Sequence, residues 1–341
     1  MKLVTFINLE NQERLGVIEN DIIYDLSRAG NEIVVEMPHN ILSFLKQLPN
    51  SLTVAKNIVD AIRAGKVKTV GNQSDFKIVA PVPHPPSCRD GYAFRQHVAS
   101  ARKNRGLEMI AEFDEYPIFY FTNHNAMIGP GQLVVQQDQL QQLDFELEVA
   151  IVIGKKCRNV TSAEADDCIF GYTIMNDFSA RLLQMEEMKL NLGPAKGKDF
   201  ATAIGPWLVT KDELEPYKIK TPYGDKYDLK MQAFHNGTLI SEGNLKDMNW
   251  TFAEIVERAS YGVDLYPGDV IGSGTVGTGC YLELNGTRAR LAKEQGSSYT
   301  PVWLKDQDTM ELKVDGLGSL MHKIVASTEG ESILKKKKTP Q

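Results

Sequence analysis

Short alternating runs of apolar and polar residues, which are typical of β-strands, recur along most of the chain. In the N-terminal part such runs lie at 2–7 and 14–18, and a stretch with helical periodicity follows at 41–64. Residues 81–86 (PVPHPP) then interrupt any helix or central strand, because proline lacks the amide donor and restricts the residue before it. We therefore place a domain boundary after residue 80.

Beyond this boundary the sequence favours more strand than helix. We expect a small β-rich N-terminal domain over 1–80 and a larger α+β, mostly β, domain over 81–341, with its helices on the outside. Strand-like runs lie at 145–154, 168–175, 229–236 and 270–274, and helical patterning is strongest at 178–189 and 251–260.

Composition and charge narrow the class of protein. The 341 residues carry a formal charge of -6 with acids and bases interspersed, so no basic stripe is available for a nucleic acid. No run of about eighteen apolar residues and no secretory signal occurs, so we expect a cytoplasmic protein without a membrane partner. The four cysteines form no CxxC pair and are expected to be free thiols. Neither a Walker loop nor a dinucleotide-binding glycine motif is present.

Two glutamates stand out in the run DFELEVA at 144–150. In a strand alternate side chains share a face, so Glu146 and Glu148 project together while their neighbours point the other way. They lie either on a solvated edge or in a cleft, and the apolar residues Ala150 and Val152 farther along the same face favour the cleft. Adjacent carboxylates in a cleft need a cation, and oxygen ligands alone suit Mg²⁺, Ca²⁺ or Mn²⁺.

A third carboxylate, Asp177, follows an apolar strand and precedes the expected helix. It either caps that helix or shares one helical face with Arg181 and Gln184, at spacings of four and seven residues. The shared face would offer a metal ligand, a carboxylate-binding fork and an amide; a surface pair of Asp177 with Arg181 is the plainer alternative.

Residues just after the boundary supply a candidate base. Asp90, Tyr92 and His97 lie in the run RDGYAFRQH. A single histidine is more often an ordinary surface or core residue, but a neutral imidazole near a metal would suit proton abstraction from water. Lys198 and Thr275 lie in glycine-rich turns, which by themselves are common loops.

Taken together and in this order, DFELEVA, NDFSARLLQ (176–184), GKDF (197–200) and PGDVIGSGT (267–275) resemble the fumarylacetoacetate hydrolase superfamily. The similarity covers about residues 89–324. It implies a mixed β-sandwich roll with a small N-terminal β module, a homodimer, and a place in aromatic amino acid catabolism.

The resemblance also assigns roles to residues of this chain. It implies a divalent cation, Mg²⁺ or Ca²⁺, held by Asp90, Glu146, Glu148 and Asp177, and His97 as the general base. Substrate would be bound by Tyr92, Tyr120, Thr275, Arg181 and Gln184, with Lys198 stabilising the developing negative charge.

One departure concerns the partner of His97. The branch with this histidine spacing carries a glutamate on a longer loop after the SGT turn, and here residues 275–280 are short and contain no acid. We therefore expect an acid from the segment after His97 to orient it, provided that this segment closes as a lid. The candidates are Glu108, Glu112, Asp114 and Glu115.

The expected activity is metal-dependent hydrolysis of a carbon-carbon bond in a small diketo acid such as fumarylacetoacetate or a related acylpyruvate. A decarboxylase, isomerase or dehydratase of a keto acid on the same scaffold is the main alternative, because fold does not fix function. A non-catalytic module that binds a metal and a carboxylate is the third hypothesis.

Overall fold

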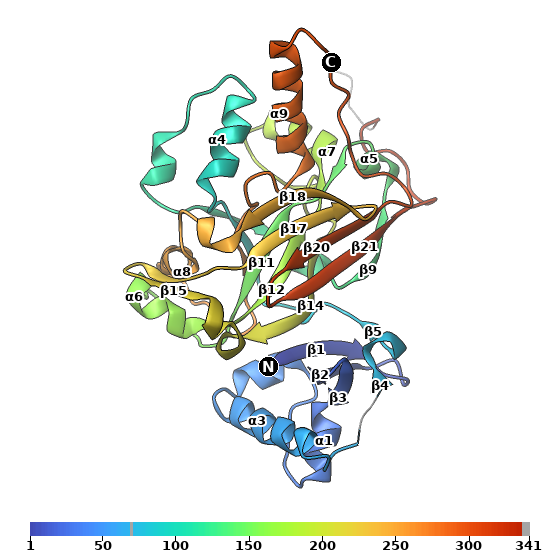
Figure 1. Cartoon of the computed structure of the whole chain (residues 1–341), viewed down its shortest axis with the longest axis vertical. Helices are drawn as coiled ribbons and strands as arrows, with labels where there is room; N and C mark the ends of the chain where they lie inside the picture. The colour runs from blue at the N-terminus through green and yellow to red at the C-terminus, as the bar shows by residue number, and fades with distance from the viewer. Residues whose placement is uncertain (69–70, 336–341) are drawn as a thin grey trace, which may run out of the picture.

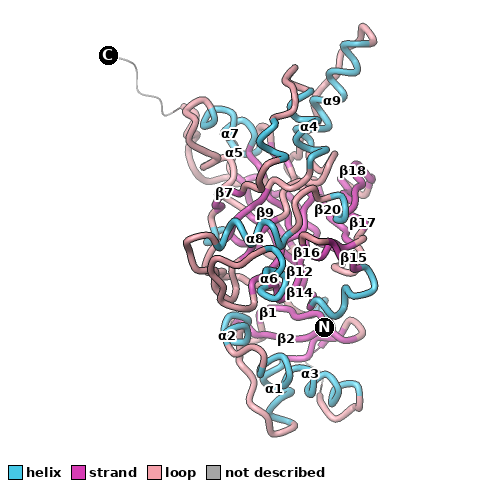
Figure 2. Tube along the Cα trace, turned by 90° about the vertical axis from the view of Figure 1, so that its left-hand side faces the viewer, coloured by secondary structure: helices cyan, strands magenta, loops and turns pink. Residues whose placement is uncertain are grey.

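The computed structural model describes residues 1–68 and 71–335. It contains two packed β-sheets with helices around them, and the N-terminal segment forms a smaller lobe at one end (Figures 1 and 2). The predicted α+β class with mixed sheets is confirmed. Among the described residues no helix is both long and apolar enough to cross a membrane, and all four cysteines are buried free thiols.

The larger sheet runs through both lobes in the order β4-β3-β2-β1-β14-β12-β11-β19-β6-β7. Most neighbours are antiparallel, whereas β19 and β6 are parallel. The strands are β1 (Lys2–Ile7), β2 (Glu13–Glu19), β3 (Ile22–Asp25), β4 (Gly71–Asn72), β6 (Cys88–Gly91), β7 (Phe119–Thr122), β11 (Leu147–Ile153), β12 (Ile169–Asp177), β14 (Thr202–Thr210) and β19 (Val270–Gly272). Two short strands, β5 (Lys77–Ile78) and β8 (Met127–Ile128), pair with β1 and β14.

The second sheet has the order β18-β17-β20-β21-β9. Its first hairpin turns at Asn236 and Gly237, whose φ angles of 49° and 77° match the Asn-Gly signal for a two-residue turn. The strands are β9 (Gly131–Val135), β17 (Lys230–His235), β18 (Thr238–Asn244), β20 (Thr309–Val314) and β21 (Gly318–Ala326). Two-stranded pairs are formed by β10 (Leu143–Asp144) with β13 (Ser179–Ala180) and β15 (Lys218–Thr221) with β16 (Gly224–Tyr227).

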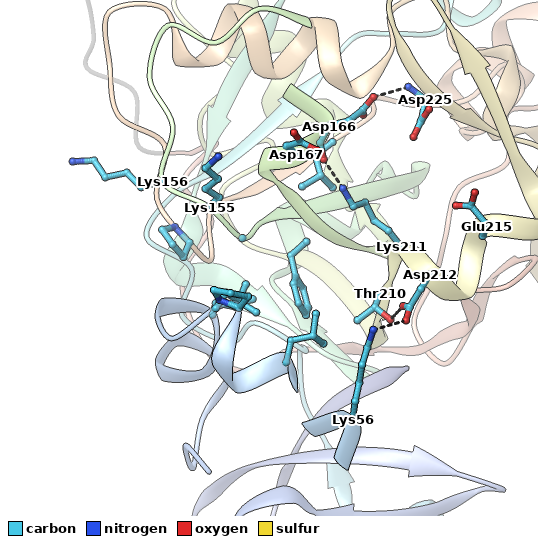
Figure 3. Close-up of a pocket in the computed structure, with 18 of the residues that line it drawn as sticks. Lys56, Lys155, Lys156, Asp166, Asp167, Thr210, Lys211, Asp212, Glu215 and Asp225 are labelled. Carbon is cyan, nitrogen blue, oxygen red and sulfur yellow. Dashed lines mark hydrogen bonds and ion pairs between the residues drawn. The ribbon is translucent and has the colours of Figure 1, made fainter. Parts of the chain in front are cut away.

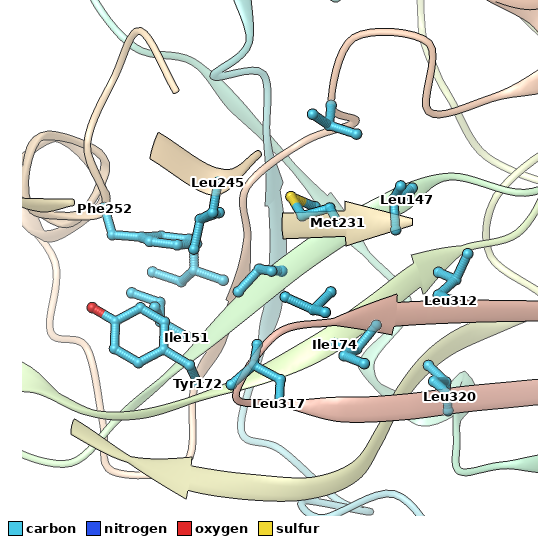
Figure 4. Packing of buried hydrophobic residues seen from close by; sticks show 14 of the residues in the cluster. Leu147, Ile151, Tyr172, Ile174, Met231, Leu245, Phe252, Leu312, Leu317 and Leu320 are labelled. Carbon is cyan, nitrogen blue, oxygen red and sulfur yellow. The ribbon is translucent and has the colours of Figure 1, made fainter. Parts of the chain in front are cut away.

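The main core lies between the two sheets. Figure 4 shows Ile151 and Ile174 of the larger sheet facing Met231 and Leu320 of the second sheet. The opposite face of β11 packs toward the N-terminal lobe through Ala150 and its neighbours. Glu148 lies in a central strand that is buried on both faces and is itself fully buried, so the solvated-edge alternative for this carboxylate is wrong.

The N-terminal lobe contains the expected strands and also helices α1 (Leu26–Glu32), α2 (Ile41–Lys46) and α3 (Asn50–Arg63). The helical stretch predicted at 41–64 is therefore two helices. Strand β1 pairs with β14, so the lobe extends the larger sheet. We keep residue 80 as the proposed boundary, since the chain leaves the lobe after β5.

The helices of the larger lobe lie outside the sheets (Figure 1). Helices α7 (Arg181–Met188) and α8 (Phe252–Ser260) match the two helical segments expected there. Helices α4 (Arg95–Lys103) and α9 (Tyr281–Glu294), which contact each other, had not been predicted. Two short helices, α5 (Gln137–Leu140) and α6 (Ser162–Ala165), complete this layer.

Candidate active site

Three buried carboxylates meet where β6, β19 and β11 lie side by side. Asp90 is the next-to-last residue of β6, Glu146 immediately precedes β11 and Glu148 is within it. One oxygen from each lies within 4.8 Å of the others, and the three residues are at most 6% exposed. These are three of the four metal ligands that the sequence suggested.

Gly272 of β19 makes this convergence possible, because it lies opposite both Asp90 and Ala150 in the sheet. A Cβ atom at this position would be 2.4 Å from the Asp90 Oδ1 atom and 3.0 Å from the Glu148 Oε2 atom. Any larger residue would occupy the space between the carboxylates. The PGDVIGSGT run therefore contributes Gly272 to the site, because the missing side chain leaves room for the carboxylates.

Asp177, the fourth expected ligand, is the last residue of β12 and is fully buried. Its Oδ2 atom accepts hydrogen bonds from the Tyr120 hydroxyl and from Lys198 Nζ, the latter at 2.7 Å. Lys198 Nζ also lies 2.5 Å from Glu146 Oε2. The lysine therefore joins Asp177 to the carboxylate cluster.

Burial dominates the electrostatics of these acids. It raises the pKa of Asp90 to about 7, raises the pKa of Asp177 despite Lys198, and raises the pKa of Glu148 well above its ordinary value. Burial opposes ionisation of Glu146 as well, but the charges of Lys198 and Arg181 outweigh it and lower that pKa to about 2.

These residues fit a hard divalent cation. Glu148 Oε2 and Asp177 Oδ1 are buried and have no hydrogen-bond partner among residues 1–68 and 71–335. Buried carboxylate oxygens normally have a partner, and a donor set made only of oxygens is the one that Mg²⁺, Ca²⁺ and Mn²⁺ prefer. Two cations of the chain, Lys198 and Arg181, do not neutralise this group of acids.

His97 is buried on α4 and is paired with Glu283 of α9. The Nδ1 atom of His97 lies 2.6 Å from Glu283 Oε2, which also accepts the backbone N–H of Thr278 at 3.0 Å. This pair corrects our expectation that an acid of the 108–115 segment orients the histidine. Asp114 instead pairs with Arg95 on the surface.

The turn after β19 links this His97–Glu283 pair to the carboxylates. Thr275 Oγ1 lies 3.3 Å from Glu148 Oε1, and three residues later Thr278 bonds to Glu283. On the other side, the Tyr92 ring lies edge-on to the His97 ring at a centroid distance of 6.0 Å. The histidine, the glutamate and the carboxylate cluster therefore belong to one site.

Arg181 and Gln184 lie together at the start of α7, as expected. Arg181 donates to Gln184 Oε1 at 2.9 Å, to Glu146 Oε1 at 2.7 Å and to Asp144 Oδ2 at 2.8 Å. The single helical face with Asp177 was wrong, because that residue ends a strand and does not cap α7. Lys198 and Glu146 bring Asp177 to the same place by another route.

The expected substrate contacts surround the carboxylates. Tyr120 lies on β7 beside Asp90 and donates to Asp177, and Thr275 contacts Glu148. Tyr92 also packs edge-on against Phe113, whose carbonyl accepts a hydrogen bond from Trp250. Among the described residues, the structure thus brings every site residue suggested by the sequence into one region, together with Glu283 and Asp144, which the sequence reasoning missed.

A separate cavity of about 850 Å³ lies between α2 and α3 and the far ends of β11 and β12 (Figure 3). Its apolar wall includes Phe170, which lies near the start of β12, whereas Asp177 lies at the other end of this strand. None of the expected site residues lines the cavity. Lys56 there pairs with Asp212, and Lys211 binds the carbonyl of Asp166. This cavity does not contribute to the site described above.

The family model described as "Fumarylacetoacetate (FAA) hydrolase C-terminal" matches residues 87–325. Because the match covers more than half of the chain, the protein belongs to this enzyme family, and the resemblance noted in the sequence is confirmed.

Relatives within the family differ in reaction. The chain is 27% identical to oxaloacetate tautomerase YisK of Bacillus subtilis (strain 168) over 321 residues. This alignment covers 90% of this chain and 94% of the relative. It is 32% identical over 204 residues to 2,4-didehydro-3-deoxy-L-rhamnonate hydrolase of Sphingomonas sp. (strain SKA58), or 60% of this chain and 63% of the relative.

A solved structure shares the fold. Maleylpyruvate hydrolase from Sphingobium sp. SYK-6, in complex with manganese(II) and pyruvate, matches with a TM-score of 0.66 and 22% identity over 96% of this chain and all of that chain. The family therefore includes both hydrolases and tautomerases on this architecture.

Proposed function

We propose that this protein hydrolyses a carbon-carbon bond in a small diketo acid of the acylpyruvate type, with His97 as the general base. The observation that carries this proposal is the buried His97–Glu283 pair beside four acidic residues. A histidine held by a carboxylate is a suitable acceptor for the proton of an attacking water.

Glu283 sets the role of each nitrogen of the His97 ring. An ionised Glu283 accepts the Nδ1 proton, so that the neutral imidazole carries its free lone pair on Nε2. Nε2 accepts no hydrogen bond from the described residues and is available to take a proton from water. The same carboxylate then stabilises the imidazolium until the proton is passed to the leaving carbon.

The remaining polar residues bind and polarise the substrate. Lys198, Arg181 and Gln184 place donors at one edge of the cluster, where they stabilise negative charge on the carbonyl oxygen under attack. Water supplies a hydroxyl to the acyl carbon, the carbon-carbon bond breaks, and the expelled carbon receives the proton held by His97.

The divalent cation would be held by Asp90, Glu146 and Glu148 with the free Oδ1 atom of Asp177. When bound, it would supply Lewis-acid stabilisation of the enolate that leaves. Maleylpyruvate hydrolase, with its manganese and pyruvate, supports both the cation and a 2-oxo acid as the ligand class.

Arg102 and Arg105 support an anionic substrate. Arg102 lies in the last turn of α4, the helix that carries His97, and Arg105 follows this helix. Burial raises the pKa of Tyr92, and the positive charges of Arg105 and Arg102 partly offset this rise. A substrate with a second carboxylate beyond its acyl carbonyl, as in fumarylpyruvate, would meet these charges.

Tautomerisation of oxaloacetate is the second candidate, favoured by the nearly full-length relative from Bacillus subtilis. It needs only a proton acceptor and a stabilised enolate, and His97 with the same donors would provide both. No water would be consumed and no carbon-carbon bond would break.

A steady-state assay separates these functions. Fumarylacetoacetate, fumarylpyruvate, acetylpyruvate and oxaloacetate are each incubated with the chelated protein, with and without Mg²⁺ or Mn²⁺. The proposal predicts metal-dependent cleavage of at least one diketo acid, which His97→Ala abolishes while Mn²⁺ binding is retained. Enol-keto conversion of oxaloacetate without cleavage of any diketo acid would favour the tautomerase. We also propose a homodimer, which a monomer mass by light scattering would contradict.

A further inference from the structure

Asp144, which belongs to the DFELEVA run but has no role in the chemistry above, has an unusual set of contacts. It is fully buried in the short strand β10 and both of its oxygens are in use. Oδ1 accepts the backbone N–H groups of Phe145 at 2.9 Å and Tyr281 at 2.7 Å. Oδ2 accepts hydrogen bonds from Arg181 Nε at 2.8 Å and from the backbone N–H of Leu282 at 2.9 Å.

These contacts connect the two halves of the site. Arg181 is the first residue of α7 and holds Glu146 and Gln184. Tyr281 and Leu282 are the first two residues of α9, and the next residue, Glu283, binds His97. The Asp144 carboxylate therefore holds two things in place. One is the Arg181 guanidinium beside the metal-ligand carboxylates, and the other is the first turn of α9, which carries Glu283, the partner of His97.

The chemistry of these contacts favours an ionised Asp144. Its partners are a buried guanidinium and two N–H groups at the start of a helix, which together are an environment for a negative charge. Loss of the charge would leave Arg181 with less compensation in a buried place.

We propose that Asp144 is a positioning residue that holds Arg181 and the first turn of α9 in one rigid arrangement, and through Glu283 aligns His97. This inference rests on the proposed function of the site. It assigns to Asp144 no contact with the substrate.

The test is Asp144→Asn, which keeps the shape of the side chain and removes its charge. The matched control is Asp25→Asn in the N-terminal lobe. Asp25 is also buried, accepts Arg14 Nε at 2.8 Å and accepts the N–H groups of Ser27 and Arg28, both at 3.0 Å, at the start of α1. We expect both variants to lose comparable stability and only Asp144→Asn to disturb the active site.

In turnover we expect Asp144→Asn to lower kcat by on the order of 100-fold, since small misplacements of reacting groups have effects of this size. Asp25→Asn should keep kcat within threefold. Combined with Glu283→Gln, the Asp144 variant should lose much less than the product of the two single losses, because both act through His97. Additive losses would overturn the proposal.

A second readout does not depend on turnover. The His97 Nδ1 proton, buried in its bond to Glu283, should give a downfield ¹H NMR signal that His97→Ala removes. Asp144→Asn should broaden or abolish it, and Asp25→Asn should not. If Asp144→Asn does not fold, Asp144→Asn/Arg181→Gln, which leaves no uncompensated guanidinium, should fold and lose the signal. Arg181→Gln alone should keep it, and a folded double variant that keeps the signal would overturn the proposal.

The two proposals fail in different ways. A wild-type protein that cleaves no diketo acid contradicts the proposed function, and the NMR signal then decides the role of Asp144. A wild type that does cleave, together with an Asp144→Asn variant that retains kcat within threefold or keeps the His97 signal unchanged, overturns the positioning role alone.

Discussion

Replacing Glu283 by glutamine should lower kcat without disturbing the fold. Glu283 Oε2 alone accepts both His97 Nδ1 and Thr278 N–H, so the single carbonyl oxygen of a glutamine can keep both contacts. What is lost is the negative charge that stabilises the imidazolium once His97 has taken a proton.

The size of this effect follows from the contact. A hydrogen bond to a charged group contributes about 1.5–3 kcal/mol, and each 1.4 kcal/mol is a factor of ten in rate. With Glu283 only 3% exposed, little solvent screens this charge, so we expect kcat to fall by roughly 10- to 150-fold with KM nearly constant.

The assay is steady-state cleavage of acetylpyruvate or fumarylpyruvate at saturating Mg²⁺. Glu254→Gln provides the matched control, because Glu254 is also a first-turn glutamate that bonds locally, to Thr251, but lies outside the site. A Glu283→Gln enzyme with kcat within threefold of the wild type would refute the role of the carboxylate.

Three further outcomes are expected. Gly272→Ala should weaken Mn²⁺ binding in calorimetry by roughly tenfold or more, since its Cβ atom would lie 2.4 Å from Asp90 Oδ1, whereas Gly193→Ala, with no neighbour closer than 3.6 Å, should not; equal affinities would place the cation elsewhere. Adding Mg²⁺ or Mn²⁺ at a hundred times its Kd to chelated protein should stabilise it by about 2.7 kcal/mol, seen as a higher Tm; an unchanged Tm would contradict the site. Finally, burial lowers the pKa of His322 to about 4, so the stability that comes from its neutral form is complete above pH 6.5 and is lost as the pH falls through 4. The difference between the ordinary histidine pKa of 6.5 and the value of about 4 corresponds to about 3 kcal/mol in the free energy of unfolding. Between pH 7 and 4 the His322→Gln variant should therefore lose less stability than the wild type by about this amount in urea titrations. Equal losses in the two proteins would show that His322 does not titrate in this way.

The sequence predicted the parts of the site that depend on strand geometry. Alternation predicts Glu146 and Glu148 on one face, and their oxygens do meet although Glu146 lies just before β11. The other face of β11, with Leu147 and Ile151, is buried between the sheets. The Asn236-Gly237 turn also depends on a local signal, because these two residue types readily adopt the positive φ angles of a two-residue hairpin turn.

The parts that it missed depend on contacts between distant segments. Helix α9 has few buried side chains, Tyr281, Glu283 and Asn285, so its apolar periodicity is too weak to predict the helix or to single out Glu283. A signal was present in the three-residue spacing of Cys280 and Glu283, which resembles a capping box. Asp144 gave no such signal, because its partners lie 37 and 137 residues away.

The most direct test of the central claim is the fate of water oxygen. Acetylpyruvate is incubated with the Mg²⁺-loaded protein in H₂¹⁸O, and the acetate released is analysed by mass spectrometry. Hydrolysis with His97 as the base predicts acetate that carries one ¹⁸O from solvent in the wild type and no acetate in His97→Ala. Recovery of acetylpyruvate, fumarylpyruvate and fumarylacetoacetate all uncleaved across the pH range, with or without the cation, would contradict it.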